Sequence, residues 1–100
     1  HAPRHVLAER VEAALMAGCG GVVCAASDVA DVKAIGPDLI AVTPGVRPAG
    51  DALHDQGRPA TPAEALAAGA DLLVVGRAVT AAADPVAAAA RLVESLEAAR

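Results

Sequence analysis

The residues of this chain that are best suited to chemistry are anion ligands, and two of them directly follow an apolar run. Residues 72–75 are branched and apolar, as in a buried strand, and Gly76 and Arg77 come immediately after them. Glycine lets a ligand approach the backbone closely. The guanidinium of arginine is a planar fork that matches a phosphate. In a barrel of alternating strands and helices, a phosphate binds after a late strand, so Gly76 and Arg77 are candidate phosphate ligands.

Two further polar side chains lie in the long loop expected over residues 43–60, which follows the second apolar run. Arg47 stands in the sequence TPGVRP, and Gln56 lies deeper in the loop, in DQGR. Long ordered loops in compact domains are usually functional. If the strands are adjacent and parallel, an arginine, an amide and the backbone of Gly76–Arg77 converge on one rim. They would form a phosphate cradle there.

Each of these residue types also has an ordinary role. An arginine at a strand end is often a solvated surface charge, Gln56 can be a simple loop residue, and Arg58 can pair with a neighbouring aspartate. His54 has no evident partner, and we expect it at the surface. Asp31 and Lys33 lie two residues apart in a predicted helix, where such positions face apart, so we expect both to be solvated.

A recurring pattern predicts the elements that position these groups. Three times a helical stretch ends in glycine and an apolar run follows. The runs are residues 22–26, 39–42 and 72–75. Apolar runs that alternate with helices predict parallel βαβ units in a sheet buried on both faces. Gly18, Gly36 and Gly69 are expected to end their helices in the left-handed conformation.

Helix start signals complete the order of the elements. Residues 3–17 place apolar side chains on one face at helical spacing, and Ser27-Asp28 precedes the next helix. Thr61 with Glu64 predicts a capping box, and Asp84 begins the last helix in a similar way. The predicted order is therefore α-β-α-β-loop-α-β-α.

Composition argues against several kinds of partner, namely nucleic acids, membranes and metal ions. The net charge is −4 and aromatic residues are absent, so we expect no nucleic acid as partner. No apolar run approaches the about 20 residues of a membrane span, and no signal peptide is recognisable, so we expect a cytoplasmic protein without membrane contact. Cys19 and Cys24 fit neither a zinc knuckle nor a redox pair, and we expect two reduced, buried thiols and no metal site.

Size and composition also indicate an incomplete structure. A core without aromatic side chains would be marginal, and three strands cannot close a barrel, which takes about 250 residues. Open strand edges would expose unpaired backbone groups. We therefore expect further strands elsewhere, before His1 or on another chain.

A series of motifs closely resembles orotidine 5′-monophosphate decarboxylase. In chain order the motifs are GGVVCA at 20–25, VTPGVRP at 42–48, DQGRPATP at 55–62, GAD at 69–71, VGRAVT at 75–80 and DP at 84–85. The resemblance covers nearly the whole chain and is strongest from residue 20 to 85. It is specific because several motifs occur in the family's order, with the gaps of its carboxyl-terminal portion.

The resemblance implies a fold, an activity and a set of ligands. The fold is the carboxyl-terminal part of a (β/α)8 TIM barrel, about strands 6–8 with flanking helices, so residues 1–100 would be one partial domain. The family converts orotidine monophosphate to uridine monophosphate and CO2, in de novo pyrimidine biosynthesis, without metal or organic cofactor. Arg77 would bind the 5′-phosphate with the Gly76 amide, Gln56 would span phosphate and pyrimidine, and Arg47 would match a substrate-binding arginine. A homodimer is implied too.

The chain departs from the family at the catalytic centre, which is a Lys-Asp-Lys-Asp network. Lys33 is the only lysine here, and residues 31–36 have glycine where the second aspartate would stand. We therefore assign no catalytic residue to this chain, and expect it to be inactive without the missing amino-terminal half of the barrel.

Two alternatives remain open from the residues. One is another sugar-phosphate lyase or epimerase of the related barrels, which turnover of a ketose phosphate would reveal. The other is a non-catalytic phosphate-binding or assembly module, which would retain uridine monophosphate without any decarboxylation.

Overall fold

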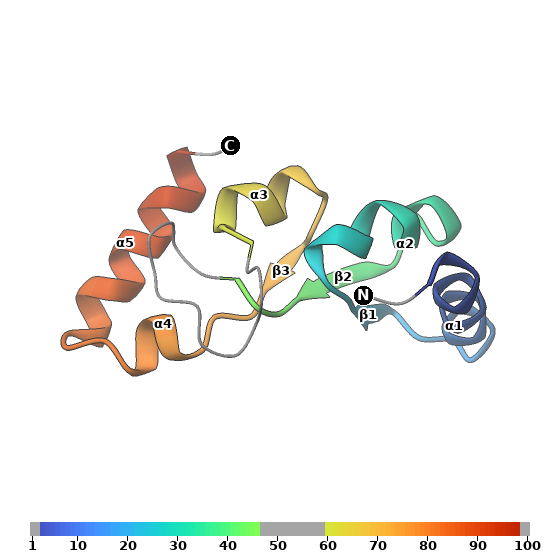
Figure 1. Ribbon diagram of the computed structural model, residues 1–100, viewed down its shortest axis with the longest axis horizontal. Helices are drawn as coiled ribbons and strands as arrows, with labels where there is room; N and C mark the ends of the chain where they lie inside the picture. The colour runs from blue at the N-terminus through green and yellow to red at the C-terminus, as the bar shows by residue number, and fades with distance from the viewer. Residues whose placement is uncertain (1–2, 47–59, 99–100) are drawn as a thin grey trace.

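The three strands form one parallel sheet in the order β1-β2-β3 (Figure 1). A computed structural model describes residues 3–46 and 60–98. The strands are β1 (Gly21–Val23), β2 (Ile40–Thr43) and β3 (Leu72–Leu73). Val42 of β2 pairs with Val23 on one side and with Leu72 on the other. The predicted parallel order is confirmed, but β1 and β3 are shorter than the apolar runs that predicted them.

Helices follow the strands in the predicted order, with two short additions. They are α1 (Arg4–Met16), the 3-10 helix η1 (Ala26–Asp28), α2 (Val29–Ile35), α3 (Pro62–Ala67), α4 (Arg77–Thr80) and α5 (Pro85–Ala98). Neither η1 nor α4 was predicted from the sequence. Figure 1 shows α2 and α3 on the same side of the sheet, as right-handed crossovers require, and α5 at the far end beside α3 and α4. Within the described ranges, no helix is long and apolar enough to cross a membrane.

Thr61, Glu64 and Asp84 cap their helices as predicted, whereas Asp28 at the start of α2 makes no side-chain cap hydrogen bond. Thr61 Oγ1 accepts a hydrogen bond from the Glu64 amide at 3.1 Å, and Glu64 Oε1 accepts one from the Thr61 amide at 2.9 Å. Asp84 Oδ1 accepts from the Ala87 amide at 3.1 Å, which anchors the start of α5. These contacts satisfy amides that have no partner within their own helices.

The three helix-ending glycines are not alike. Gly18 and Gly69 have φ of 82° and 105°, the predicted left-handed conformation. The prediction for Gly36 is wrong, because its φ is −128°. Close packing favours glycine at position 36, because a Cβ there would lie 2.6 Å from Leu39 Cδ1 and 3.3 Å from Leu15 Cδ2.

Only one face of the sheet is buried in the part of the chain that the structure describes. One core cluster joins β2 to α2 and α3 through Val29, Ala41, Val46, Ala65 and Ala70, and a second comprises Val11, Val32 and Leu39. The opposite side, which we name the open face, presents four exposed apolar side chains: Val23, Ile40, Leu72 and Val74. The expectation of burial on both faces is therefore wrong for these residues, because α2 and α3 cover the same face.

Candidate functional site

The carboxyl ends of the three strands lie at one rim. The Cys24 amide donates to the Val42 carbonyl at 3.0 Å, and the Val74 amide donates to the Thr43 carbonyl at 2.9 Å. Hydrogen bonding thus continues just beyond β1 and β3. The residues that follow each strand are therefore held side by side, as the convergence of ligands at a barrel rim requires.

Gly76 and Arg77 lie at this rim, at the turn from β3 into α4. The Gly76 carbonyl accepts hydrogen bonds from the Val79 and Thr80 amides at 3.0 and 3.1 Å and from Thr80 Oγ1 at 3.3 Å. These hydrogen bonds from α4 stabilise the conformation of the turn. A Cβ built on Gly76 would meet no atom within 4 Å, so the space beside its backbone is open. Arg77 is exposed at the first position of α4.

Arg47 and Gln56, the other two predicted ligands, lie outside the described residues, as do His54 and Arg58. The flanking residues are placed: Val46 is buried and pairs with Ala60 as an isolated parallel bridge. Gly45 has φ of 72° and makes the turn that leads from β2 to Val46. The convergence of Arg47 and Gln56 with Arg77 stays a prediction.

Lys33 and Asp71 meet at the opposite, amino-terminal end of the sheet. Lys33 Nζ donates to Asp71 Oδ2 at 2.6 Å and to the Leu39 carbonyl at 2.7 Å. The expectation that Lys33 is solvated is therefore wrong, because the helix-sheet packing carries it to the start of β3. Asp31 lies 3.4 Å from Arg4, an exposed ion pair. The only lysine of the chain is thus held at the end of the sheet opposite the Gly76–Arg77 turn.

The two cysteines are in different environments. Cys19 is exposed, so the expectation of two buried thiols is wrong for it, because it lies in the turn between α1 and β1. Cys24 is partly buried, and both burial and the nearby Asp28 carboxylate raise the pKa of its thiol, although Lys33 opposes them. Among residues 3–46 and 60–98, no group of His, Cys, Asp or Glu side chains is arranged to hold a metal ion.

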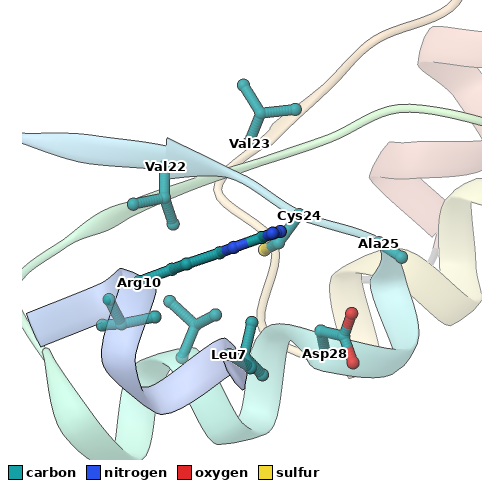
Figure 2. A pocket seen from close by; sticks show the side chains of 9 residues that line it. Leu7, Arg10, Val22, Val23, Cys24, Ala25 and Asp28 are labelled. Atoms are coloured by element: carbon teal, nitrogen blue, oxygen red, sulfur yellow. The ribbon is translucent and has the colours of Figure 1, made fainter. Parts of the chain in front are cut away.

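Sequence reasoning missed a groove beside β1. Its volume is about 400 Å³, and α1, β1, η1 and α2 surround it (Figure 2). Apolar side chains from these elements form most of its lining, with Arg10 and Asp28 as its charged members. Asp28 is buried although it is charged. The strand-then-helix order around Asp28 was visible in the sequence, but the packing of α1 that forms the groove was not.

Parallel strands joined by helices on one face, with a glycine and an arginine after the last strand, define this chain as a segment of a (β/α)8 barrel. A family model described as orotidine 5′-phosphate decarboxylase / HUMPS family matches residues 1–92. The chain belongs to this family.

Individual relatives agree with this assignment. The chain is 55% identical over 92 residues to orotidine 5′-phosphate decarboxylase of Methylobacterium sp. (strain 4-46), covering 91% of this chain and 39% of that protein. It is 56% identical over 85 residues to the enzyme of Thermobifida fusca (strain YX), and the match covers 84% of this chain and 36% of that protein. The crystal structure of the Lactobacillus acidophilus enzyme matches with a TM-score of 0.69 at 36% identity. The match covers 90% of this chain and 38% of that one. The chain therefore spans about two fifths of the length of these relatives.

Proposed function

We propose that this chain supplies the phosphate- and substrate-binding portion of an orotidine 5′-monophosphate decarboxylase, which converts orotidine monophosphate to uridine monophosphate and CO2 in pyrimidine biosynthesis. The observation that carries the proposal is the Gly76–Arg77 turn at the rim of the sheet, with open space beside the glycine. Membership of the family supports the identity of the substrate.

In this proposal the residues of the rim act on the phosphate of the nucleotide. Arg77 pairs with the 5′-phosphate, and the Gly76 backbone lies against it. Gln56 spans the phosphate and the pyrimidine, and Arg47 is a further arginine that binds the substrate. Charge-assisted hydrogen bonds contribute about 1.5–3 kcal/mol each. Binding energy from a phosphate remote from the scissile bond can lower the barrier at the reacting centre, so these groups serve catalysis without taking part in it.

The groups that act on the substrate carboxylate belong, in this proposal, to the remaining portion of the barrel. Lys33 is engaged with Asp71 and Leu39 at the other end of the sheet, and no second lysine exists in the chain. Residues 1–100 would form one partial domain that joins the other strands, in a cytoplasmic homodimer. The reaction would need no metal or organic cofactor.

The test uses a chimera in which this chain replaces the matching 92 residues of the Methylobacterium relative. We expect Arg77→Ala to lower kcat/KM for orotidine monophosphate by orders of magnitude, with the melting temperature unchanged. Arg91→Ala is the matched control, because Arg91 is an exposed arginine on α5. An unchanged kcat/KM for Arg77→Ala would refute the assignment, and turnover of a ketose phosphate instead would favour a related sugar-phosphate lyase.

Gly76 allows a second, independent test in the same chimera. Gly76→Ala places a methyl group in the open space where the phosphate would lie, so we expect KM to rise. Gly20→Ala is its control, since a Cβ there also meets no atom within 4 Å but Gly20 precedes β1 at the other end of the sheet. Equal KM values for both variants would show that the ligand does not approach Gly76.

A further inference from the structure

Thr80, the last residue of α4, makes a side-chain contact at the Gly76–Arg77 turn to which the proposed function gives no role. Its Oγ1 donates a hydrogen bond to the Gly76 carbonyl at 3.3 Å. The Val79 and Thr80 amides donate to the same oxygen at 3.0 and 3.1 Å. Thr80 therefore supplies two of the three donors that hold this carbonyl.

The orientation of the Gly76 carbonyl decides where the next amide points. A peptide bond is planar and trans, so the C=O of Gly76 and the N–H of Arg77 point in opposite directions. Because Val79 and Thr80 hold the oxygen inside α4, the N–H points out of α4 at its first residue. A Cβ built on Gly76 meets no atom within 4 Å, so the backbone beside this peptide faces open space. An anion that enters this space meets the N–H as a donor.

The local backbone alone is a weak support for this orientation. Gly76 has no Cβ, so it adopts other backbone conformations at little cost. Helix α4 has only four residues, and a single helical turn is not stable by itself. The two amides hold the Gly76 carbonyl only while that turn is helical. The Thr80 hydroxyl adds a side-chain contact that spans the turn from its last residue to the residue before its first.

A contact of this kind has no functional consequence in most helices. Threonine hydroxyls commonly bond to the carbonyl four residues earlier. At this position, however, the carbonyl belongs to the peptide that leads into Arg77, the proposed ligand of the phosphate. Thr80 itself is exposed, so replacing its hydroxyl by a methyl group disturbs no core. Its contribution to ligand binding can therefore be separated from a contribution to folding.

We propose that Thr80 is a positioning residue of the phosphate site. Its hydroxyl holds the Gly76 carbonyl and so keeps the N–H of the Gly76–Arg77 peptide directed at the phosphate of the nucleotide. Thr80 does not touch the ligand and acts through this peptide alone. The inference rests on the proposed function, which places the phosphate at this turn.

The experiment measures two ligands that differ only in the phosphate, in the chimera described above. Titration calorimetry gives the Kd for uridine monophosphate, and competition against it gives the Kd for uridine. We expect Thr80→Val to raise the Kd for uridine monophosphate at least about threefold, as loss of one hydrogen bond does, and to leave the Kd for uridine within about twofold. Equal rises for both ligands would show a merely structural role and refute the proposal, as would an unchanged Kd for uridine monophosphate.

Two further variants test whether the hydroxyl at this position is responsible. Thr80→Ser keeps the hydroxyl, so we expect it to bind uridine monophosphate with a Kd near that of the parent. Ser95→Ala is the matched control, because the Ser95 hydroxyl also donates to a carbonyl of its own helix, that of Leu92 at 2.7 Å, but near the end of α5. We expect its Kd values to be unchanged. Equal weakening in Thr80→Ser and Thr80→Val, or in Ser95→Ala and Thr80→Val, would contradict the proposal.

Arg77→Ala, measured with the same two ligands, separates this inference from the proposed function. If Arg77→Ala weakens binding of uridine monophosphate and Thr80→Val does not, the role of Thr80 is refuted and the proposed function stands. If neither variant weakens it, or if uridine monophosphate does not bind the chimera, both are refuted. If Thr80→Val alone weakens it, the peptide holds the phosphate as proposed, and the assignment of the Arg77 side chain is the part that fails.

Discussion

Lys33 Nζ and Asp71 Oδ2 lie 2.6 Å apart, and this contact joins α2 to the first residue before β3. The same Asp71 oxygen accepts the Ala41 amide at 2.8 Å, while the Asp71 amide donates to the Ala41 carbonyl at 2.9 Å. The side chain thus provides the acceptor with which the β2–β3 ladder begins. Lys33 also holds the Leu39 carbonyl, so one pair of side chains ties a helix to two strands.

Removing the Asp71 carboxylate should destabilise the chain. We expect Asp71→Ala to lower Tm by several degrees, because it leaves the Ala41 amide and the Lys33 ammonium without their acceptor. Asp71→Asn should cost less, since its amide oxygen can still accept from Ala41. Thermal unfolding followed by circular dichroism measures both. A Tm equal to that of the parent for Asp71→Ala would show that the contact contributes nothing.

The same pair predicts a dependence of stability on pH. The hydrogen bond from Lys33, and then that from Ala41, hold the pKa of Asp71 below its ordinary value. A depressed pKa in the folded state stabilises the protein above the unfolded pKa, and this stability is lost as pH falls through the folded value. We expect Tm to fall as the pH drops below about 4, the ordinary range of aspartate. In Asp71→Asn the acid-induced fall should be smaller, and an identical fall would assign it to other carboxylates.

Thr43 offers a stabilising substitution. Its side chain is fully buried at the end of β2, and its Oγ1 has no hydrogen-bond partner in the described structure. Because a buried hydroxyl without a partner carries an uncompensated desolvation cost, we expect Thr43→Val to raise the free energy of unfolding by about 1 kcal/mol. Urea denaturation measures this change, with Val42→Thr as a comparison on the opposite face. A loss of stability in Thr43→Val would reveal a partner for the hydroxyl.

Gly20, just before β1, and Gly21, its first residue, should respond differently to substitution by alanine. A Cβ at Gly21 would lie 2.6 Å from the backbone oxygen of Ile40, which cannot move without displacing β2. We expect Gly21→Ala to cost about 1–3 kcal/mol in the free energy of unfolding, as overpacking does. Gly20→Ala, where the space is open, should change stability by less than about 1 kcal/mol. Equal values for the two variants would contradict the pairing of Gly21 with Ile40.

The cysteines should react at different rates. Cys19 is exposed, whereas burial raises the pKa of the partly buried Cys24, so less of Cys24 is the reactive thiolate at neutral pH. With a soluble thiol reagent, we expect one fast and one slow phase, and the slow phase should accelerate at a higher pH than an ordinary thiol requires. Cys19→Ser should remove the fast phase. Its persistence in that variant would place the reactive thiol at Cys24.

Local signals in the sequence predicted the order of the elements and the capping of α3, because the Thr61–Glu64 contacts depend on residues three apart. Contacts between distant residues were not predictable. Lys33 finds Asp71 38 residues away, and the role of Gly36 follows from the position of Leu39 in the packed structure. Of the candidate site, the placement of Gly76 and Arg77 after β3 was predictable from the apolar run before them. The groove beside β1 was not, because it arises from the packing of α1.

The two ends of β3 have different roles, one structural and one in the candidate site. Asp71 anchors its start to the scaffold, and Gly76 lies just beyond its end, at the rim. Substitutions at one end therefore need not disturb the other. A protein engineer could redesign the ligand preference of the Gly76–Arg77 turn while leaving the foundation at Asp71 intact, which is a practical reason why barrels of this kind accept new substrates so readily.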